Sequence, residues 1–126
     1  MYIAGFVIPV PEAKMEAYRE WAARSSALFR EYGCLEVVES WEDYVPDGER
    51  TDFRRAVQAR AGEKIVFSWQ VWPDRATLDA VEEAMKTDPR FEISGEIPFD
   101  AGRLIYGCFA PIHTMGRGCP DSPAAA

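Results

Sequence analysis

Three side chains suited to a ligand site alternate along a β-branched and aromatic run at residues 64–72. Ser68, Gln70 and Trp72 fall on one face of this run, because every second side chain of a strand points the same way. A hydroxyl, an amide and an indole that converge in an apolar surrounding have the usual composition of a small-molecule site. The alternative is that they are satisfied polar groups where two sheets meet, since such space is often filled by side chains. The residues favour the two interpretations equally.

Basic residues form a second candidate group in an acidic chain, namely Arg50, Arg54, Arg55, Arg60 and Lys64. Guanidinium groups suit a carboxylate or phosphate ligand, because they donate paired hydrogen bonds in a fixed geometry. A solvated helix face is the favoured interpretation, since surface charges contribute little energy. Combining the strand run with two residues that would orient a planar substrate, we take as candidate ligand-binding residues Trp41, Arg54, Ser68, Gln70 and Trp72.

Other reactive side chains lack the spacing that metal binding or catalysis requires. His113 is the only histidine, and no acid or cysteine stands at ligand or triad spacing from it. Glu36 and Glu42 share a strand face but lie about 20 Å apart along it, so we read them as edge-strand charges. We expect no metal ion and no cofactor, and we assign no catalytic residue. The cysteines are odd in number, without metal-binding spacing, and are expected to be reduced and structural: Cys34, Cys108 and Cys119.

The segment 91–102 has neither helical nor strand periodicity and is flanked by charged residues. The favoured interpretation is that Asp88, Arg90, Asp100 and Arg103 form ion pairs that hold this loop in place. A role for the loop as a lid over a site is the alternative.

Composition predicts one folded domain. The chain has 126 residues, of which 48% are hydrophobic and 28% charged, as in ordinary globular proteins. Its net charge of -7 would repel a phosphate backbone, so we expect no nucleic-acid partner. No segment approaches the roughly 18 consecutive apolar residues of a membrane span, and the N-terminus lacks the basic segment of a signal peptide. We expect a cytoplasmic protein without a membrane partner.

Hydrophobic periodicity predicts four strands and two long helices. Alternating apolar residues indicate strands at residues 2–9, 34–45, 64–72 and 103–112. One helix is predicted to start at Pro11, a favoured first helical residue, and to end at Gly33, which tolerates the left-handed conformation. Another is predicted between Pro73 and Pro89, and a short one at residues 52–59 with Thr51 as its N-cap. Residues 1–114 then form one domain, followed by a flexible tail at residues 115–126.

This element order predicts an α+β fold of the ferredoxin-like βαββαβ type, with both long helices on one face of a four-stranded antiparallel sheet. The first and third strands are expected at its centre. Both strands carry apolar side chains on two faces, whereas the helices cover only one, so a monomer would expose a large apolar patch. We therefore expect a homodimer that pairs through the sheet face not covered by helices, forming a dimeric α/β barrel.

Five segments carry a family resemblance: residues 51–57, 65–69, 88–90, 98–100 and 103–107. Together they resemble the YbaA-like family of small bacterial proteins of unknown function, and the resemblance extends to Pro111. It implies a dimeric α/β barrel of ferredoxin-like subunits. That superfamily includes antibiotic-biosynthesis-type monooxygenases, haem-degrading monooxygenases and stress-responsive barrel proteins. The resemblance implies no established activity.

Two functional hypotheses follow from the sequence. The favoured one is a homodimeric small-molecule-binding or stress-associated module without catalysis, because no acid, base, metal or nucleophile constellation is present. The other is a cofactor-free monooxygenase-like or isomerase-like enzyme that holds a small planar substrate in an apolar cavity. What separates them is the sheet face that Ser68 and Gln70 occupy, and whether a cavity of a few hundred Å³ remains beside them.

Overall fold

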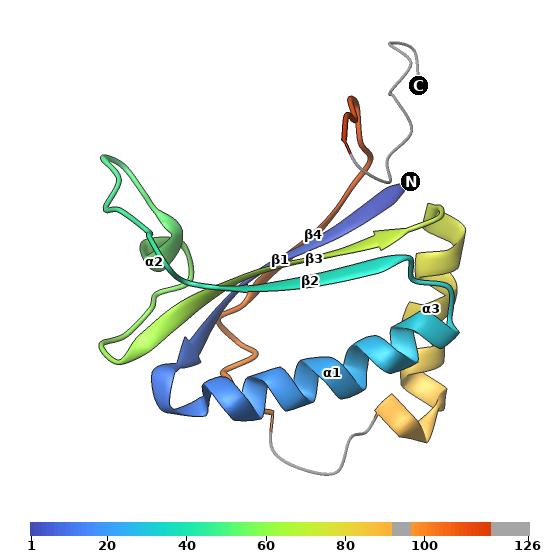
Figure 1. Ribbon diagram of the computed structural model, residues 1–126, viewed down its shortest axis with the longest axis horizontal. Coiled ribbons are helices and arrows are strands. Elements are labelled where there is room, and N and C mark those ends of the chain that lie inside the picture. Colours follow the sequence, from blue (N-terminus) through green and yellow to red (C-terminus); the bar gives the residue numbers. More distant parts are fainter. Residues whose placement is uncertain (92–96, 117–126) are drawn as a thin grey trace.

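The computed structural model describes residues 1–91 and 97–116. Its elements are β1 (Tyr2–Pro11), the 3₁₀ turn η1 (Glu12–Lys14), α1 (Met15–Glu31), β2 (Glu36–Trp41), α2 (Phe53–Ala56), β3 (Glu63–Trp72), α3 (Arg75–Thr87), the 3₁₀ turn η2 (Pro89–Phe91) and β4 (Ile105–Phe109). The strands form one antiparallel sheet, and α1 and α3 lie on the same side of it (Figure 1). The predicted α+β class and four-stranded sheet are confirmed. The short α2 lies within the helix predicted at residues 52–59 and stands between β2 and β3, so the element order departs from a plain βαββαβ arrangement.

The sheet is centred on β1 and β3, in the strand order β2-β3-β1-β4. These two strands pair along their full length, from Tyr2 opposite Trp72 to Pro11 opposite Glu63. The shorter β2 and β4 pair along the outer edges. The prediction that the first and third strands are central is therefore confirmed, and the side chains of β3 are held by strands on both sides.

Helix α1 begins later than predicted but ends as predicted. Pro11 belongs to the end of β1, and Glu12 donates its backbone N–H to the carbonyl of Gly62 at 2.8 Å. This bond keeps the chain beside the sheet, so that the α-helix begins only at Met15, after a 3₁₀ turn. Gly33 follows the helix with φ 104°, a left-handed conformation that glycine adopts without steric cost.

The two other α-helices are capped by aspartates. Asp52, rather than the predicted Thr51, caps α2, because its carboxylate accepts the backbone N–H of Arg55 at 2.8 Å. Asp74 caps α3 in the same way and accepts the backbone N–H of Thr77 at 2.8 Å. Each carboxylate satisfies an N–H that has no partner within the helix.

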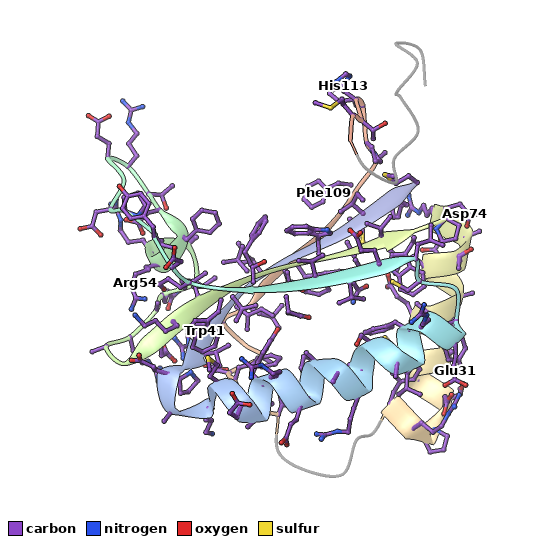
Figure 2. The ribbon with its side chains drawn as sticks, viewed as in Figure 1. Glu31, Trp41, Arg54, Asp74, Phe109 and His113 are labelled. Atoms are coloured by element: carbon purple, nitrogen blue, oxygen red, sulfur yellow. The ribbon has the colours of Figure 1, made fainter. Side chains whose placement is uncertain are left out.

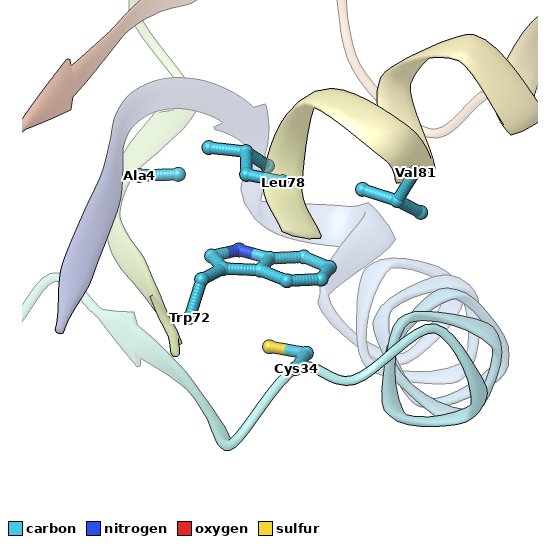
Figure 3. Packing of buried hydrophobic residues seen from close by; sticks show 5 residues of the cluster. All are labelled: Ala4, Cys34, Trp72, Leu78 and Val81. Atoms are coloured by element: carbon cyan, nitrogen blue, oxygen red, sulfur yellow. The ribbon is translucent and has the colours of Figure 1, made fainter. Parts of the chain in front are cut away.

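Two clusters of buried hydrophobic residues join the helices to the sheet. Trp72 is fully buried in the first cluster, where it packs with Ala4, Cys34, Leu78 and Val81 (Figure 3). The second cluster lies under α1 and comprises Ile8, Val10, Tyr18, Ala22 and Val66. Both clusters therefore lie on the helix-covered face, to which every even-numbered residue of β3 from Val66 to Trp72 also points.

The other face of the sheet carries apolar side chains that neither α1 nor α3 covers. We call it the open face, and its side chains come from Ile3, Val7, Phe67, Trp69, Ile105 and Phe109, which strand pairing places together. Phe67 is 45% and Phe109 60% exposed, and Figure 2 shows Phe109 on the side of the sheet away from α1. Phe67 also packs edge-on against Trp69, with ring centroids 5.8 Å apart. The uncovered apolar face expected from the strand pattern is therefore present.

Candidate functional site

A cavity of about 590 Å³ lies between the helices and the sheet. Its walls are mainly apolar, and they include Phe6 and Ile8 of β1, Trp21 and Phe29 of α1, and Leu78 and Val81 of α3. Buried side chains of both hydrophobic clusters contribute to it, and exposed side chains such as Met85, Ile97 and Tyr106 also line it, so the cavity opens to the surface. It offers an apolar space large enough for a small organic molecule.

Four polar side chains gather on one wall of this cavity: Tyr18 of α1, Glu39 of β2, and Ser68 and Gln70 of β3. Strand pairing sets their spacing. Glu39 stands directly opposite Ser68, and Gln70 stands opposite Val37, two residues before Glu39. Glu39 and Gln70 are thus diagonal neighbours on one face, a distance of about 7 Å or less between their Cβ atoms.

Glu39 accepts a hydrogen bond from the Tyr18 hydroxyl at 2.7 Å. Glu39 lines the cavity and is exposed as a whole residue, while the apolar side chains around it displace part of the water at its carboxylate. Burial therefore raises the pKa of Glu39 above its ordinary value, and hydrogen bonds from Tyr18 and Ser68 offset part of that rise. The pKa of the Tyr18 phenol is raised strongly, first by burial and then by the neighbouring carboxylate. Tyr18 consequently stays protonated and Glu39 remains the acceptor.

The amide of Gln70 is oriented by the buried indole behind it. Trp72 donates its Nε1–H to Gln70 Oε1 at 3.0 Å, and an indole nitrogen can only donate. The oxygen is thereby engaged, and no hydrogen bond joins Nε2 to another described residue. Because the described part of the chain contains no buried side-chain polar atom without a partner, Nε2 is open to the cavity. Gln70 therefore presents N–H donors to whatever occupies this space.

A second tyrosine–glutamate pair lies elsewhere in the cavity wall. The Tyr106 hydroxyl of β4 donates to Glu82 Oε1 of α3 at 3.0 Å and lies 2.9 Å from Cys108 Sγ. Burial, followed by these two neighbours, raises the pKa of Tyr106 well above its ordinary value. Among the described lining residues, Glu39 and Glu82 are the only charged side chains, so the cavity is acidic and holds no cation.

The structure brings together only part of the residue set predicted from sequence. Ser68 and Gln70 line the cavity, but they lie on the helix-covered face and not on the face expected to meet a second sheet. Trp72 lies behind Gln70 in the first hydrophobic cluster. Trp41 points to the helix side of the sheet in Figure 2, where it lines an adjoining pocket of about 320 Å³.

Arg54 is not among the residues that line the cavity, and its guanidinium is held by hydrogen bonds to other residues of the chain. Its guanidinium donates to Glu42 Oε1 at 3.0 Å and to the backbone carbonyls of Glu63 at 2.8 Å and Arg60 at 3.1 Å. Its neighbour Arg55 pairs with the Asp52 carboxylate at 2.9 Å. These two guanidiniums hold the connection between β2 and β3, a structural role that differs from the solvated helix face favoured from the sequence.

The predicted ion pairs beside the loop are present. Arg90 pairs with Asp88 and with Glu31 of α1, each at 2.9 Å. Arg103 pairs with Asp100 at 2.9 Å and with Glu63 at 2.6 Å. They link the flanks of the loop to α1 and β3, while residues 92–96 lie outside the described residues.

Sequence reasoning missed Tyr18, Glu39 and Trp21 as cavity residues. Tyr18 and Trp21 belong to the apolar face of α1, and their spacing is that of any helix packed on a core. Glu39 lies on the same edge strand as Glu36, where a charged residue has an ordinary explanation. One sequence signal distinguishes Glu39. It lies between Val37 and Trp41 on the apolar side of an alternating strand, where a single acid indicates a functional role.

No group of three or more His, Cys, Asp or Glu within residues 1–91 and 97–116 is arranged to hold a metal ion. His113 is exposed beyond β4, on the far side of the sheet from α1 (Figure 2). Cys34 and Cys108 are free thiols, whereas Cys119 and most of the predicted tail lie outside the described residues. In the same ranges, no helix has both the length and the apolar character needed to cross a membrane.

Comparison with known proteins places the chain in a family. The family described as protein of unknown function (DUF1428) matches residues 1–101. The uncharacterized protein YbaA of Escherichia coli (strain K12) is 49% identical over 112 residues, which cover 88% of this chain and 96% of YbaA. The uncharacterized protein YbaA of Shigella flexneri is similar to the same extent. The YbaA-like resemblance is thus confirmed, and the chain belongs to the DUF1428 family of proteins of unknown function.

Proposed function

We propose that this protein binds a small organic molecule in the cavity between α1, α3 and the sheet. The observation that carries the proposal is the cavity of about 590 Å³ with mainly apolar walls and a few convergent polar groups. Pockets of roughly 300–1,000 Å³ with this composition are typical of small-molecule sites. The polar groups stand on paired strands and a long helix, so little ordering is needed when a ligand binds.

The ligand is a largely apolar, planar molecule that is neutral or positively charged. The rings of Phe6, Trp21 and Phe29 provide aromatic surface for a planar ligand. An anion would face the carboxylates of Glu39 and Glu82 without a cation among the described lining residues, which makes its desolvation costly. An anionic substrate bound by Arg54 is accordingly not part of the proposal.

The proposed assembly is a homodimer of ferredoxin-like subunits that pair through their open faces. The exposed Phe67, Ile105 and Phe109 support it, since contiguous apolar surface of this kind marks an interaction site. The connection containing α2 and the segment after β4 both rise beyond the sheet on the side away from α1 (Figure 1). They flank the open face, where Phe53 of α2 packs edge-on against Phe67 with ring centroids 5.8 Å apart, while Ile105 and Phe109 of β4 stay exposed to another sheet.

Binding is tested with a neutral and an anionic fluorescent dye of similar size. Nile red, which is neutral, should bind saturably, whereas anilinonaphthalene sulfonate should bind at least about tenfold more weakly, a difference of about 1.4 kcal/mol. Ser26→Phe places a ring in the cavity wall and should weaken Nile red binding by about tenfold or more, because it fills the space.

Ala27→Phe is the matched control, since it adds the same ring one residue along on the exposed side of α1. It should leave Nile red binding unchanged. Equal binding by both variants would locate the dye on another surface, such as the open face, and would contradict the proposed site.

A cofactor-free enzyme is the second candidate function. One observation favours it over simple binding: a carboxylate whose pKa is raised by an apolar cavity stands beside an amide with open N–H donors. A binding protein for apolar molecules needs neither group to be placed in this way, whereas a proton-transfer enzyme needs both.

A further inference from the structure

Glu39 has the position and the free acceptor capacity of a base. An ionised carboxylate offers about four lone-pair sites, and the hydroxyls of Tyr18 and Ser68 account for two of them. Glu39 lines the cavity and is exposed, so its remaining sites are accessible to a molecule bound there. A substrate in the cavity can therefore bring a C–H bond against this carboxylate while Tyr18 keeps it in place.

Gln70 has the position of a donor to a carbonyl oxygen. Its amide is turned by Trp72 so that Nε2 faces the cavity, and its neighbouring strand position puts it on the same wall as Glu39. Donors fixed in an apolar site stabilise a developing oxyanion more than water does, because they need no reorganisation during the reaction. The separation of about 7 Å between the Cβ atoms of diagonal strand neighbours leaves room for a carbonyl and its α-carbon between the two side chains.

We propose that this site catalyses proton transfer at the carbon next to the carbonyl of a neutral, planar ketone, with Glu39 as the base and Gln70 as the oxyanion donor. The inference rests on the proposed function, because the same cavity must first admit the ligand. It goes further by naming the substrate class and the two groups that react with it.

The reaction needs no cofactor and no second substrate. Glu39 takes the α-proton, the electron pair of the C–H bond becomes the C=C bond of an enolate, and the carbonyl π pair moves to oxygen. Gln70 donates a hydrogen bond to that oxygen. Protonated Glu39 then returns the proton, to the same carbon or, in a β,γ-unsaturated ketone, to the γ-carbon, which yields the conjugated isomer. Electrons and protons balance, and nothing is oxidised.

The test uses 2-tetralone, a neutral bicyclic ketone with an acidic benzylic α-position. Proton NMR in D₂O follows loss of the C1 signal, with and without protein. The wild-type protein should accelerate exchange above the buffer rate. Glu39→Gln should reduce that acceleration by about 100-fold or more, as expected for loss of a general base. Gln70→Met, which removes the donor, should reduce it by about 100-fold.

Glu36→Gln is the matched control, because Glu36 lies on the same strand but points to the other face, where it accepts from Trp69 Nε1. It should exchange 2-tetralone as the wild type does. Saturation-transfer NMR measures 2-tetralone binding by each variant in parallel. If the ketone binds but exchanges only at the buffer rate, or if Glu39→Gln matches the wild type, the proton-transfer role is wrong and the binding function stands. If neither the ketone nor Nile red binds, the proposed function itself fails.

Tyr18→Phe provides a second readout that does not depend on the Glu39 variant folding. The Tyr18 hydroxyl lowers the pKa of Glu39, so its removal should move the acidic limb of the rate profile to higher pD. The titratable and charged groups around Glu39 in the cavity and the adjoining pocket are Tyr18, Arg19, Glu82 and Tyr106. An unshifted limb would contradict the assignment of Glu39 as the base.

Discussion

At the scale of single residues, the hydrogen bond from Trp72 to Gln70 fixes the orientation of the Gln70 amide in the cavity wall. The indole is fully buried and donates to Gln70 Oε1. Trp72→Phe should lower the free energy of unfolding by about 1–3 kcal/mol, because it leaves a buried carbonyl oxygen without a partner. Urea unfolding followed by circular dichroism measures this change.

A double-mutant cycle separates that hydrogen bond from loss of packing. Gln70→Leu removes the acceptor, so the double variant Gln70→Leu/Trp72→Phe contains no unpaired group. Its destabilisation should be smaller than the sum of the two single effects, since contacting residues are coupled. Additive single effects would show that the contact does not link these side chains energetically.

At the scale of elements, Arg103 and Glu63 join the approach to β4 to the start of β3. The pair is bidentate, at 2.7 and 2.6 Å, and both side chains are largely buried. Arg103 lowers the pKa of Glu63 from 4.5 to about 2. Because the pKa of Glu63 is lower in the folded protein, its carboxylate stabilises the fold at pH values above 4.5, its ordinary pKa. That stabilisation is lost as the pH falls toward 2. The wild-type melting temperature should therefore fall over this acidic range.

Arg103→Met should destabilise the protein by about 3–5 kcal/mol at neutral pH, because it leaves Glu63 without its partner. It should also flatten the dependence of melting temperature on pH between 4.5 and 2, which differential scanning calorimetry records. Lys86→Met is the control, since it breaks only the exposed pair with Glu83 and should change neither quantity. Parallel pH curves for the wild type and Arg103→Met would exclude Glu63 as the group responsible.

Alternation and capping patterns predicted the elements, but they did not predict which sheet face the helices cover. Ser68 and Gln70 share a face by periodicity alone. Both faces of β3 are substantially apolar, so the pattern does not reveal that α1 and α3 pack over these two residues. Pro11 shows the limit of local signals, because pairing with β3 overrides a residue type that favours a helix start. The hydrogen-bond acceptors of Arg54 come together only in the folded connection between β2 and β3, so the sequence pattern could not predict them either.

At the scale of the whole molecule, the proposed homodimer would cover the exposed aromatic surface of the open face without contacting the cavity. The open face and the cavity lie on opposite sides of the sheet, so association and ligand binding should respond to different substitutions.

Phe67→Glu places a charge on the central strand of the open face and should convert a dimer into a monomer, because an unpaired buried carboxylate is costly. Ala27→Glu, on the exposed side of α1, should leave the dimer intact. Light scattering over a dilution series to sub-micromolar concentration measures the mass. A folded wild-type monomer throughout would reject the homodimer, and loss of Nile red binding in a folded Phe67→Glu monomer would show that the cavity depends on the partner.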